Sequence, residues 1–170
     1  TSELIGSPLG PCPAWLFPAP NAEASIADTW VVQVHGRGTT RAETLRAVPV
    51  FRELGMTSLV VSYRNDGEAP RSRAGTYSLG ATEWRDVDAA VAFALRRGAK
   101  RIVLMGWSMG GAIVLQLALN SVHAHAIVGI VLDSPVTDWR LVLGFQAREL
   151  RVPSPVSNLA LGALQSEFSG

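Results

Sequence analysis

One short stretch of the sequence has the residue types and the spacing of a nucleophile for acyl transfer. Gly106-Trp107-Ser108-Met109-Gly110 matches the pattern Gly-x-Ser-x-Gly. An apolar strand candidate, Arg101–Met105, precedes it, and an almost wholly apolar helix candidate, Ala112–Leu119, follows it. A strand–turn–helix of this kind holds the serine in a strained turn with its hydroxyl exposed, and the flanking glycines avoid side-chain clashes. We therefore predict that Ser108 is a nucleophile, the alternative being a turn in which Ser108 only caps the helix.

A second motif, His35-Gly36-Arg37-Gly38, follows another apolar strand candidate, Thr29–Val34. Acyl transfer needs two N–H donors aimed at the developing oxyanion. We expect one from the backbone of Met109 and the other from the backbone of Arg37. The Arg37 guanidinium could also attract a carboxylate-bearing substrate, the alternative being a solvated or structural ion-pair partner. His35 is expected to brace the loop by hydrogen bonds rather than to act as a base.

The elements that must position these motifs alternate along the chain. Buried strand candidates alternate with helix candidates, which predicts an α/β fold: a mostly parallel, doubly wound sheet with helices on both faces and right-handed crossovers. A short hairpin that comes first is expected at one margin of the sheet. The strand candidates are Glu3–Gly6, Cys12–Phe17, Thr29–Val34, Thr57–Tyr63, Arg101–Met105 and Ala126–Leu132. The helix candidates are Thr40–Leu54, Thr82–Arg97, Ala112–Leu119, Asp138–Arg151 and Asn158–Gln165.

Two details of the first helix candidate are specific. Thr40-Arg41-Ala42-Glu43 has the spacing of a capping box, in which the threonine and glutamate side chains accept hydrogen bonds from the first backbone N–H groups. Pro49 lies inside the candidate and predicts a kink or a break there, because proline has no N–H to donate.

Composition narrows the class of protein. The chain has 170 residues and a mass of 18.1 kDa, with 48% hydrophobic and 17% charged residues, which predicts one folded domain rather than a disordered segment. Fifteen basic residues against 14 acidic ones give a formal net charge of +1, so no nucleic-acid partner is expected. No apolar run has the length of a membrane span, and the one cysteine, Cys12, excludes an internal disulfide. We expect a cytoplasmic location, while the first residue, Thr1, leaves a secreted or membrane-anchored form open.

On these motifs the sequence resembles the α/β-hydrolase superfamily, and in detail bacterial hydrolases of the serine-aminopeptidase and acyl-esterase type. The resemblance covers about Leu4 to Trp139 and implies six strands in the order 1-2-4-3-5-6, with the last two strands of the family missing. It also implies a serine hydrolase that cleaves an ester, a thioester or an amide, with a small-molecule acyl substrate and with no metal or organic cofactor. The segments that carry it are His35–Gly38, Tyr63–Gly67, Glu83–Ala90, Gly106–Gly111 and Val131–Pro135.

The resemblance also implies where the partners of the nucleophile should come. Family members run serine, acid and histidine along the chain, and the usual positions of the last two lie beyond the sixth strand. His123 and His125 do follow Ser108, but the intervening helix would separate them from it by roughly 18 Å. Asp133, at the end of the strand next to the nucleophile strand, is a candidate acid, the alternative being an aspartate that braces a turn.

Three expectations follow from the missing partners. Residues 1–170 would form a single hydrolase core that is incomplete at its C-terminus, with 136–170 as the start of a lid or helical region. Without a general base the chain by itself would be nearly inactive, and the alternative function is a catalytically inactive binding module on the same scaffold. The strand at 126–132 would be an apolar, unpaired sheet edge, which predicts self-association or coverage by the segment after Pro153.

The sequence leaves the substrate open. The loop Arg64–Leu79 and the region after Pro135 would shape the pocket, and Trp107 either lines that pocket or packs behind the turn. A nucleotide-binding interpretation is disfavoured, because Gly36-Arg37-Gly38 is not followed by the third glycine of a dinucleotide fingerprint.

Overall fold

The computed structural model describes residues 1–20 and 26–138. The chain divides into two compact units, Thr1–Pro135 and Val136–Gly170. The helices and strands described below belong to the first unit. The helix expected at Asn158–Gln165, all but the first residue of the one expected at Asp138–Arg151, and almost all of the expected lid region lie outside the described residues.

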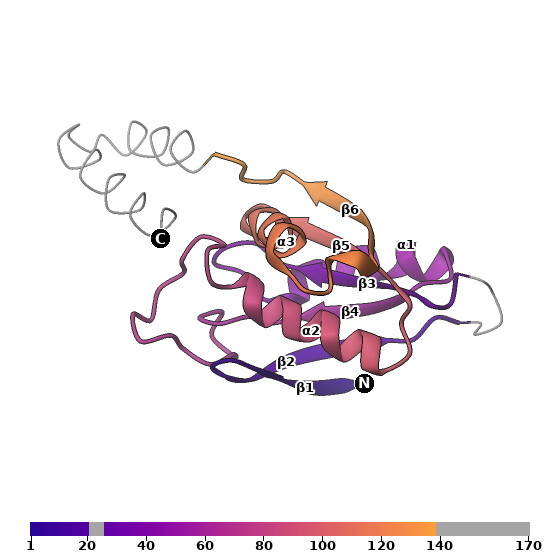
Figure 1. Ribbon diagram of the computed structural model, residues 1–170, viewed down its shortest axis with the longest axis horizontal. Helices are drawn as coiled ribbons and strands as arrows, with labels where there is room; N and C mark the ends of the chain where they lie inside the picture. The colour runs from indigo at the N-terminus through magenta and orange to yellow at the C-terminus, as the bar shows by residue number, and fades with distance from the viewer. Residues whose placement is uncertain (21–25, 139–170) are drawn as a thin grey trace. The chain divides into compact units, whose positions relative to one another are not determined.

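Six strands of the first unit form one sheet (Figure 1). Their order is β1-β2-β4-β3-β5-β6, with β3, β4, β5 and β6 paired in parallel and the β1–β2 hairpin antiparallel at one margin. The mostly parallel sheet, its N-terminal hairpin and the strand order are therefore confirmed. The strands are β1 (Ser2–Ser7), β2 (Gly10–Phe17), β3 (Thr29–Val34), β4 (Thr57–Val61), β5 (Arg101–Trp107) and β6 (Ile127–Asp133).

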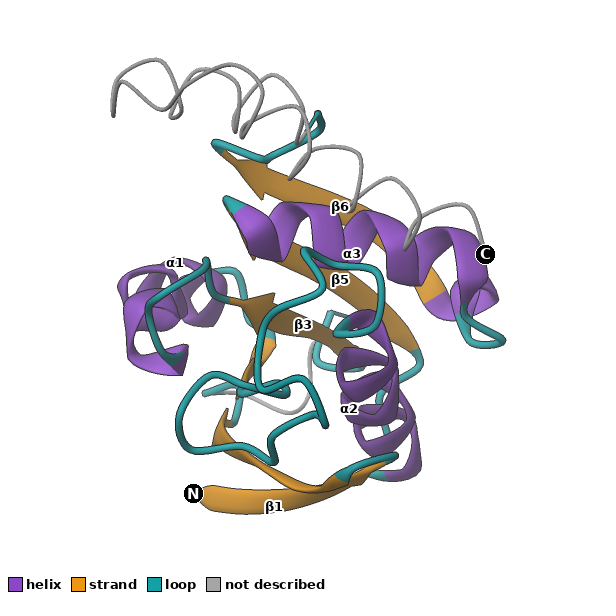
Figure 2. Cartoon of the chain, turned by 90° about the vertical axis from the view of Figure 1, so that its left-hand side faces the viewer, coloured by secondary structure: helices purple, strands orange, loops and turns teal. Residues whose placement is uncertain are grey.

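Helices cover both faces of this sheet, with α1 on one side and α2 and α3 on the other (Figure 2). Successive side chains of a strand point to opposite faces of the sheet, so each central strand contributes side chains to the packing against the helices on both faces. On the α1 side, Val31 and Trp107 pack against Ala47 and Phe51. The helices are η1 (Arg41–Ala47, a 3-10 helix), α1 (Val48–Glu53), α2 (Trp84–Arg96), α3 (Met109–Asn120) and the 3-10 turn η2 (Ala124–Ala126).

The helix expected over Thr40–Leu54 is broken, as Pro49 predicted. The chain forms the 3-10 helix η1 and then the separate helix α1, and Pro49 lies in the first turn of α1. A proline there costs no hydrogen bond, because the first N–H groups of a helix have no partner within it. Among the described residues no helix combines the length and the apolar character needed to cross a bilayer.

The strands differ sharply in burial from the centre of the sheet to β6. Every residue of β3 and of β4 is buried. Along β6, by contrast, four large apolar side chains are exposed, and within the described residues β6 pairs only with β5. Unpaired backbone groups beside exposed apolar side chains favour association with another strand. The four are Val128, Ile130, Val131 and Leu132.

We predict that the isolated chain self-associates through β6. Val131→Lys should shift sedimentation equilibrium towards the monomer, because a lysine on an edge strand opposes pairing with a second edge. Val50→Lys is the matched control, since Val50 is also an exposed valine but lies on α1. A chain that is monomeric at all concentrations, or equal association of the two variants, would contradict the prediction.

Candidate active site

Ser108 lies in a strained turn between β5 and α3. Its φ of 50° and ψ of −116° place a non-glycine residue at positive φ, which costs of order 1–3 kcal/mol. The Ser108 N–H donates to the Asp133 carbonyl at 3.0 Å, and the Ser108 carbonyl accepts from Gly111 N–H at 2.9 Å. Ser108 makes no side-chain capping bond to α3. The alternative in which Ser108 is only a helix cap therefore has no support in the hydrogen bonding.

The glycines on either side of Ser108 are required by close backbone approach. A Cβ on Gly106 would lie 2.6 Å from the Gly111 nitrogen, because α3 turns back directly over the end of β5. A Cβ on Gly110 would lie 2.6 Å from the His35 carbonyl oxygen, because α3 begins against the end of β3. Both contacts are too short for any side chain, so the glycines at the two flanking positions allow the turn to exist.

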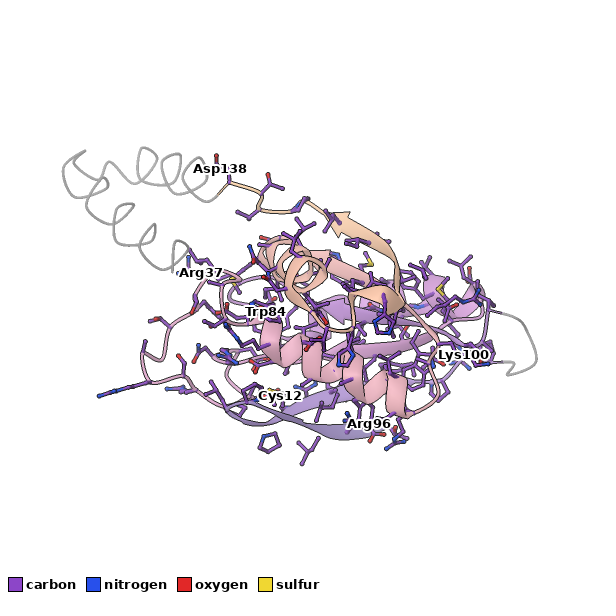
Figure 3. All side chains as sticks on the ribbon, viewed as in Figure 1. Cys12, Arg37, Trp84, Arg96, Lys100 and Asp138 are labelled. Carbon is purple, nitrogen blue, oxygen red and sulfur yellow. The ribbon has the colours of Figure 1, made fainter. Side chains whose placement is uncertain are left out.

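The loop after β3 lies against this turn. The position of a Cβ on Gly36 is 3.3 Å from the Ser108 Cβ and 3.4 Å from the Trp107 carbonyl oxygen. Arg37 is exposed, at the end of the sheet to which the arrows of β3 and β5 point (Figure 3). Met109 is buried and is the first residue of α3, where backbone N–H groups have no acceptor within the helix. The two segments expected to supply oxyanion donors are therefore neighbours at Ser108.

His35 is fully buried and braces the loop. Its Nδ1 is 2.8 Å from the Gly36 carbonyl oxygen, and its Nε2 is 3.2 Å from Asp66 Oδ2. Its ring stacks on Tyr63 with the centroids 4.3 Å apart, and the Tyr63 hydroxyl donates to the His35 and Gly36 carbonyls. Burial raises the pKa of Asp66, but hydrogen bonds from His35, Ser62 and the Ala69 backbone outweigh it and leave the pKa below its usual value.

The long loop between β4 and α2 is fixed by two buried acids at the start of α2. Asp86 accepts two hydrogen bonds from the Arg64 guanidinium, at 2.7 and 2.8 Å, and a third from the Arg64 backbone N–H. Glu83 accepts from the backbone N–H groups of Ser78 and Gly80. A Cβ on Gly80 would touch Ala112 of α3 at 3.4 Å, so the end of this loop packs onto the helix that follows Ser108.

Glu43 is a residue of this site whose role the sequence did not reveal. A capping box would direct its carboxylate to the Thr40 N–H; instead Oε2 accepts from Gly36 N–H at 3.0 Å and from the Thr39 hydroxyl at 2.6 Å. The Thr40 side chain does cap η1, by accepting from the Ala42 N–H. Burial raises the pKa of Glu43, but these two hydrogen bonds and the charge of Arg46 lower it below its usual value overall.

The family model of the alpha/beta hydrolase family matches residues 12–169. The chain belongs to this family. An esterase of Pyrococcus furiosus has 21% identity and a TM-score of 0.69 over 99% of this chain and 62% of its own. An esterase from Exiguobacterium antarcticum has 15% identity and a TM-score of 0.59 over 96% and 60%. A monoacylglycerol lipase of Paleococcus ferrophilus has 20% identity and a TM-score of 0.55 over 85% and 52%.

These similarities concern the fold, because identities this low do not carry a substrate. The chain spans about three-fifths of the length of the two esterases. No curated protein sequence matches it significantly. Among the described residues no group of three or more His, Cys, Asp or Glu side chains could hold a metal ion.

The three histidines of this hydrolase-family chain do not include a positioned base for Ser108. His35 has both ring nitrogens in contact with loop atoms and is shut off from solvent. His123 and His125 follow the C-terminal end of α3, about 18 Å of helix away from Ser108, and the ring of His125 contacts the Val122 carbonyl.

Asp133, the candidate acid, braces the turn in this structure. It pairs with Trp107 in the sheet register, and its carbonyl holds the Ser108 N–H. Its half-exposed carboxylate accepts from the Ser134 hydroxyl and lies 3.6 Å from an Arg46 nitrogen. The backbone of Asp133 thus braces the turn at Ser108, while an acid role for its carboxylate stays a prediction.

Trp107 packs behind the turn rather than lining an open pocket. Its side chain is 3% exposed and packs in the core between β3 and α1. The Arg46 guanidinium lies 5.3 Å from the Trp107 ring centroid, so Arg46 spans from Trp107 to Asp133. Of the two positions that the sequence left open for Trp107, lining the pocket or packing behind the turn, the structure shows the second.

Gly110→Ala should disrupt the turn severely. The new Cβ would overlap the backbone of β3, so we expect a loss of at least about 2 kcal/mol in the free energy of unfolding, measured by urea denaturation. Gly6→Ala is the matched control, because a Cβ there meets nothing within 4 Å, and it should change stability by less than about 0.5 kcal/mol. Equal stabilities of the two variants would show that the close approach is not real.

Asp66 should make stability acid-sensitive. Because its folded pKa is lowered, its contribution is complete above the unfolded pKa of about 3.9 and is lost as pH falls through the folded pKa. Urea denaturation of Asp66→Asn should therefore show a flatter decline below about pH 4 than the parent chain. Glu53→Gln, at an exposed position on α1, should keep the parent profile. A parent-like acid limb in Asp66→Asn would contradict the assignment.

Proposed function

We propose that this chain carries the nucleophile and the oxyanion hole of a serine hydrolase that cleaves an ester, a thioester or an amide. Ser108 Oγ attacks the acyl carbon, and the backbone N–H groups of Met109 and Arg37 stabilise the oxyanion that forms. Collapse of this intermediate breaks the bond to the leaving group, which takes up the proton that the Ser108 hydroxyl lost. Water then hydrolyses the acyl-serine, which releases the acid and returns a proton to Ser108 Oγ.

The observation that carries the proposal is the backbone of Ser108. A serine held at positive φ between a strand and a helix, where flanking glycines are sterically required, is costly and has no evident structural purpose. The names of the esterases and of the lipase support an ester as the first substrate to test. Epoxide hydrolases share the fold as well, so the fold alone does not choose the reaction.

A second candidate function, ligand binding without catalysis, is supported by the positions of the histidines. The proton of the Ser108 hydroxyl needs a general base, and none of the three histidines is placed to accept it. A catalytically inactive module that binds a small acyl ligand at the same turn would need no base. Removal of a triad base leaves only the rate enhancement of the oxyanion hole and of binding, about 10³–10⁴-fold over water.

A fluorophosphonate probe separates the two functions. We expect slow but stoichiometric labelling of Ser108 in the folded chain, followed by mass spectrometry of the labelled peptide. Ser108→Ala should abolish labelling. Ser134→Ala is the matched control and should keep the parent rate, because Ser134 also has a positive φ of 50° but lies just after β6 rather than between β5 and α3.

Each other outcome has a definite meaning. Folded chain that is never labelled at Ser108 would contradict the nucleophile and favour the binding module. Labelling at the rate of an intact serine hydrolase would show that a general base is present after all.

A further inference from the structure

The Glu43 carboxylate joins the two ends of the loop after β3 to η1. Oε2 of Glu43 accepts a hydrogen bond from the Gly36 backbone N–H and another from the Thr39 hydroxyl. The same hydroxyl lies 3.1 Å from the Gly36 carbonyl oxygen, so Thr39 closes the loop on itself. One partly buried carboxylate oxygen therefore fixes the first residue after His35 and the residue that precedes the cap of η1.

This contact lies next to the proposed nucleophile. The position that a Cβ on Gly36 would occupy is 3.3 Å from the Ser108 Cβ and 3.5 Å from Glu43 Oε2. Gly36 thus separates the carboxylate from the serine by the thickness of one backbone segment. Any shift of this segment changes the distance between Ser108 and the amide of Arg37, the next residue in the chain.

The direction of the Gly36 N–H has a chemical consequence. An N–H that donates to Glu43 is not free to donate to an oxyanion, so the loop has Arg37 N–H as its next available donor. A carboxylate beside an oxyanion would also repel it, and the nearby charge of Arg46 offsets part of that of Glu43. The positions of the two hydrogen bonds to Glu43 therefore determine where the loop lies, and the charge of Glu43 only adds strength to those bonds.

Building on the function proposed above, we propose that Glu43 is a positioning residue for the loop after β3. By accepting a hydrogen bond from Gly36 N–H, it orients this loop so that Arg37 N–H is left to donate to the substrate. It does not touch the reacting atoms. An uncharged acceptor of the same shape should serve nearly as well because it keeps both hydrogen bonds, whereas truncation should release the loop.

The test compares Glu43→Gln and Glu43→Ala in the full chain. The glutamine oxygen can accept both hydrogen bonds, so we expect Glu43→Gln to label Ser108 with fluorophosphonate within about threefold of the parent rate. Glu43→Ala should lower that rate by about 10- to 100-fold, because small displacements of catalytic groups cost this much. Glu53→Ala, an exposed acid on the adjacent helix, should leave the rate unchanged.

A second readout does not depend on Ser108. Hydrogen exchange of the Gly36 amide, followed by NMR, should be slow in the parent and in Glu43→Gln and about tenfold or more faster in Glu43→Ala. Thr39→Val, which removes only one of the two donors, should fall between them and serves if Glu43→Ala does not fold.

The outcomes distinguish this inference from the proposed function. Unchanged Gly36 exchange in the folded Glu43→Ala and Thr39→Val variants would overturn the contact itself. Faster exchange without slower labelling would overturn the positioning role, and so would equal loss of labelling in Glu43→Gln and Glu43→Ala. If Ser108 of the parent is not labelled at all, the proposed function fails and the positioning role fails with it, while Gly36 exchange still decides whether Glu43 holds the loop.

Discussion

The close approach of three backbone segments at Ser108 is the constraint on which the rest of this structure depends. The end of β5, the start of α3 and the end of β3 come within distances that leave no room for a side chain at Gly106 or Gly110. The turn that results forces Ser108 to positive φ. The unfavourable backbone conformation persists because its surroundings over-determine it: the Asp133 carbonyl holds the Ser108 N–H, and Met109 is buried directly after it.

In the loops around this turn, acidic side chains accept hydrogen bonds from backbone N–H groups that helices and strands would pair with backbone carbonyls. Asp66 and Glu83 each accept backbone N–H groups of the loop between β4 and α2, and Asp86 holds Arg64 at the start of that loop. Glu43 does the same for the loop after β3. Hydrogen bonds to a charged acceptor are stronger than neutral ones, and partial burial strengthens them further. The loop after β3, which lies against Ser108, and the loop between β4 and α2, which contacts His35 and Ala112, are thereby each held in one conformation.

The elements and their order were largely predictable, and the contacts between side chains were not. Apolar runs and the glycine spacing around Ser108 predicted the strands and the strand–turn–helix, and Pro49 predicted the break between η1 and α1. The capping-box pattern was half right: Thr40 caps η1, but Glu43 bonds to Gly36. A four-residue pattern could not reveal this, because the competing donor is set by the path of the preceding loop. Which side of the sheet Trp107 packs on was equally a matter of partners distant in the chain.

By itself the sequence determined the α/β class, the alternation of strands and helices, and the one position where a serine must stand in a tight turn. These features are local, because strand and helix periodicity and the need for glycine depend only on residues that are close together in the sequence. Only the tertiary structure decided that Asp133 braces Ser108 through its backbone, that His35 is held by Asp66, and that the Glu43 carboxylate faces Gly36. Two of these contacts join residues at least 25 positions apart in the sequence, and the third spans a loop. All three therefore depend on how whole elements pack, and a short stretch of sequence does not specify that packing.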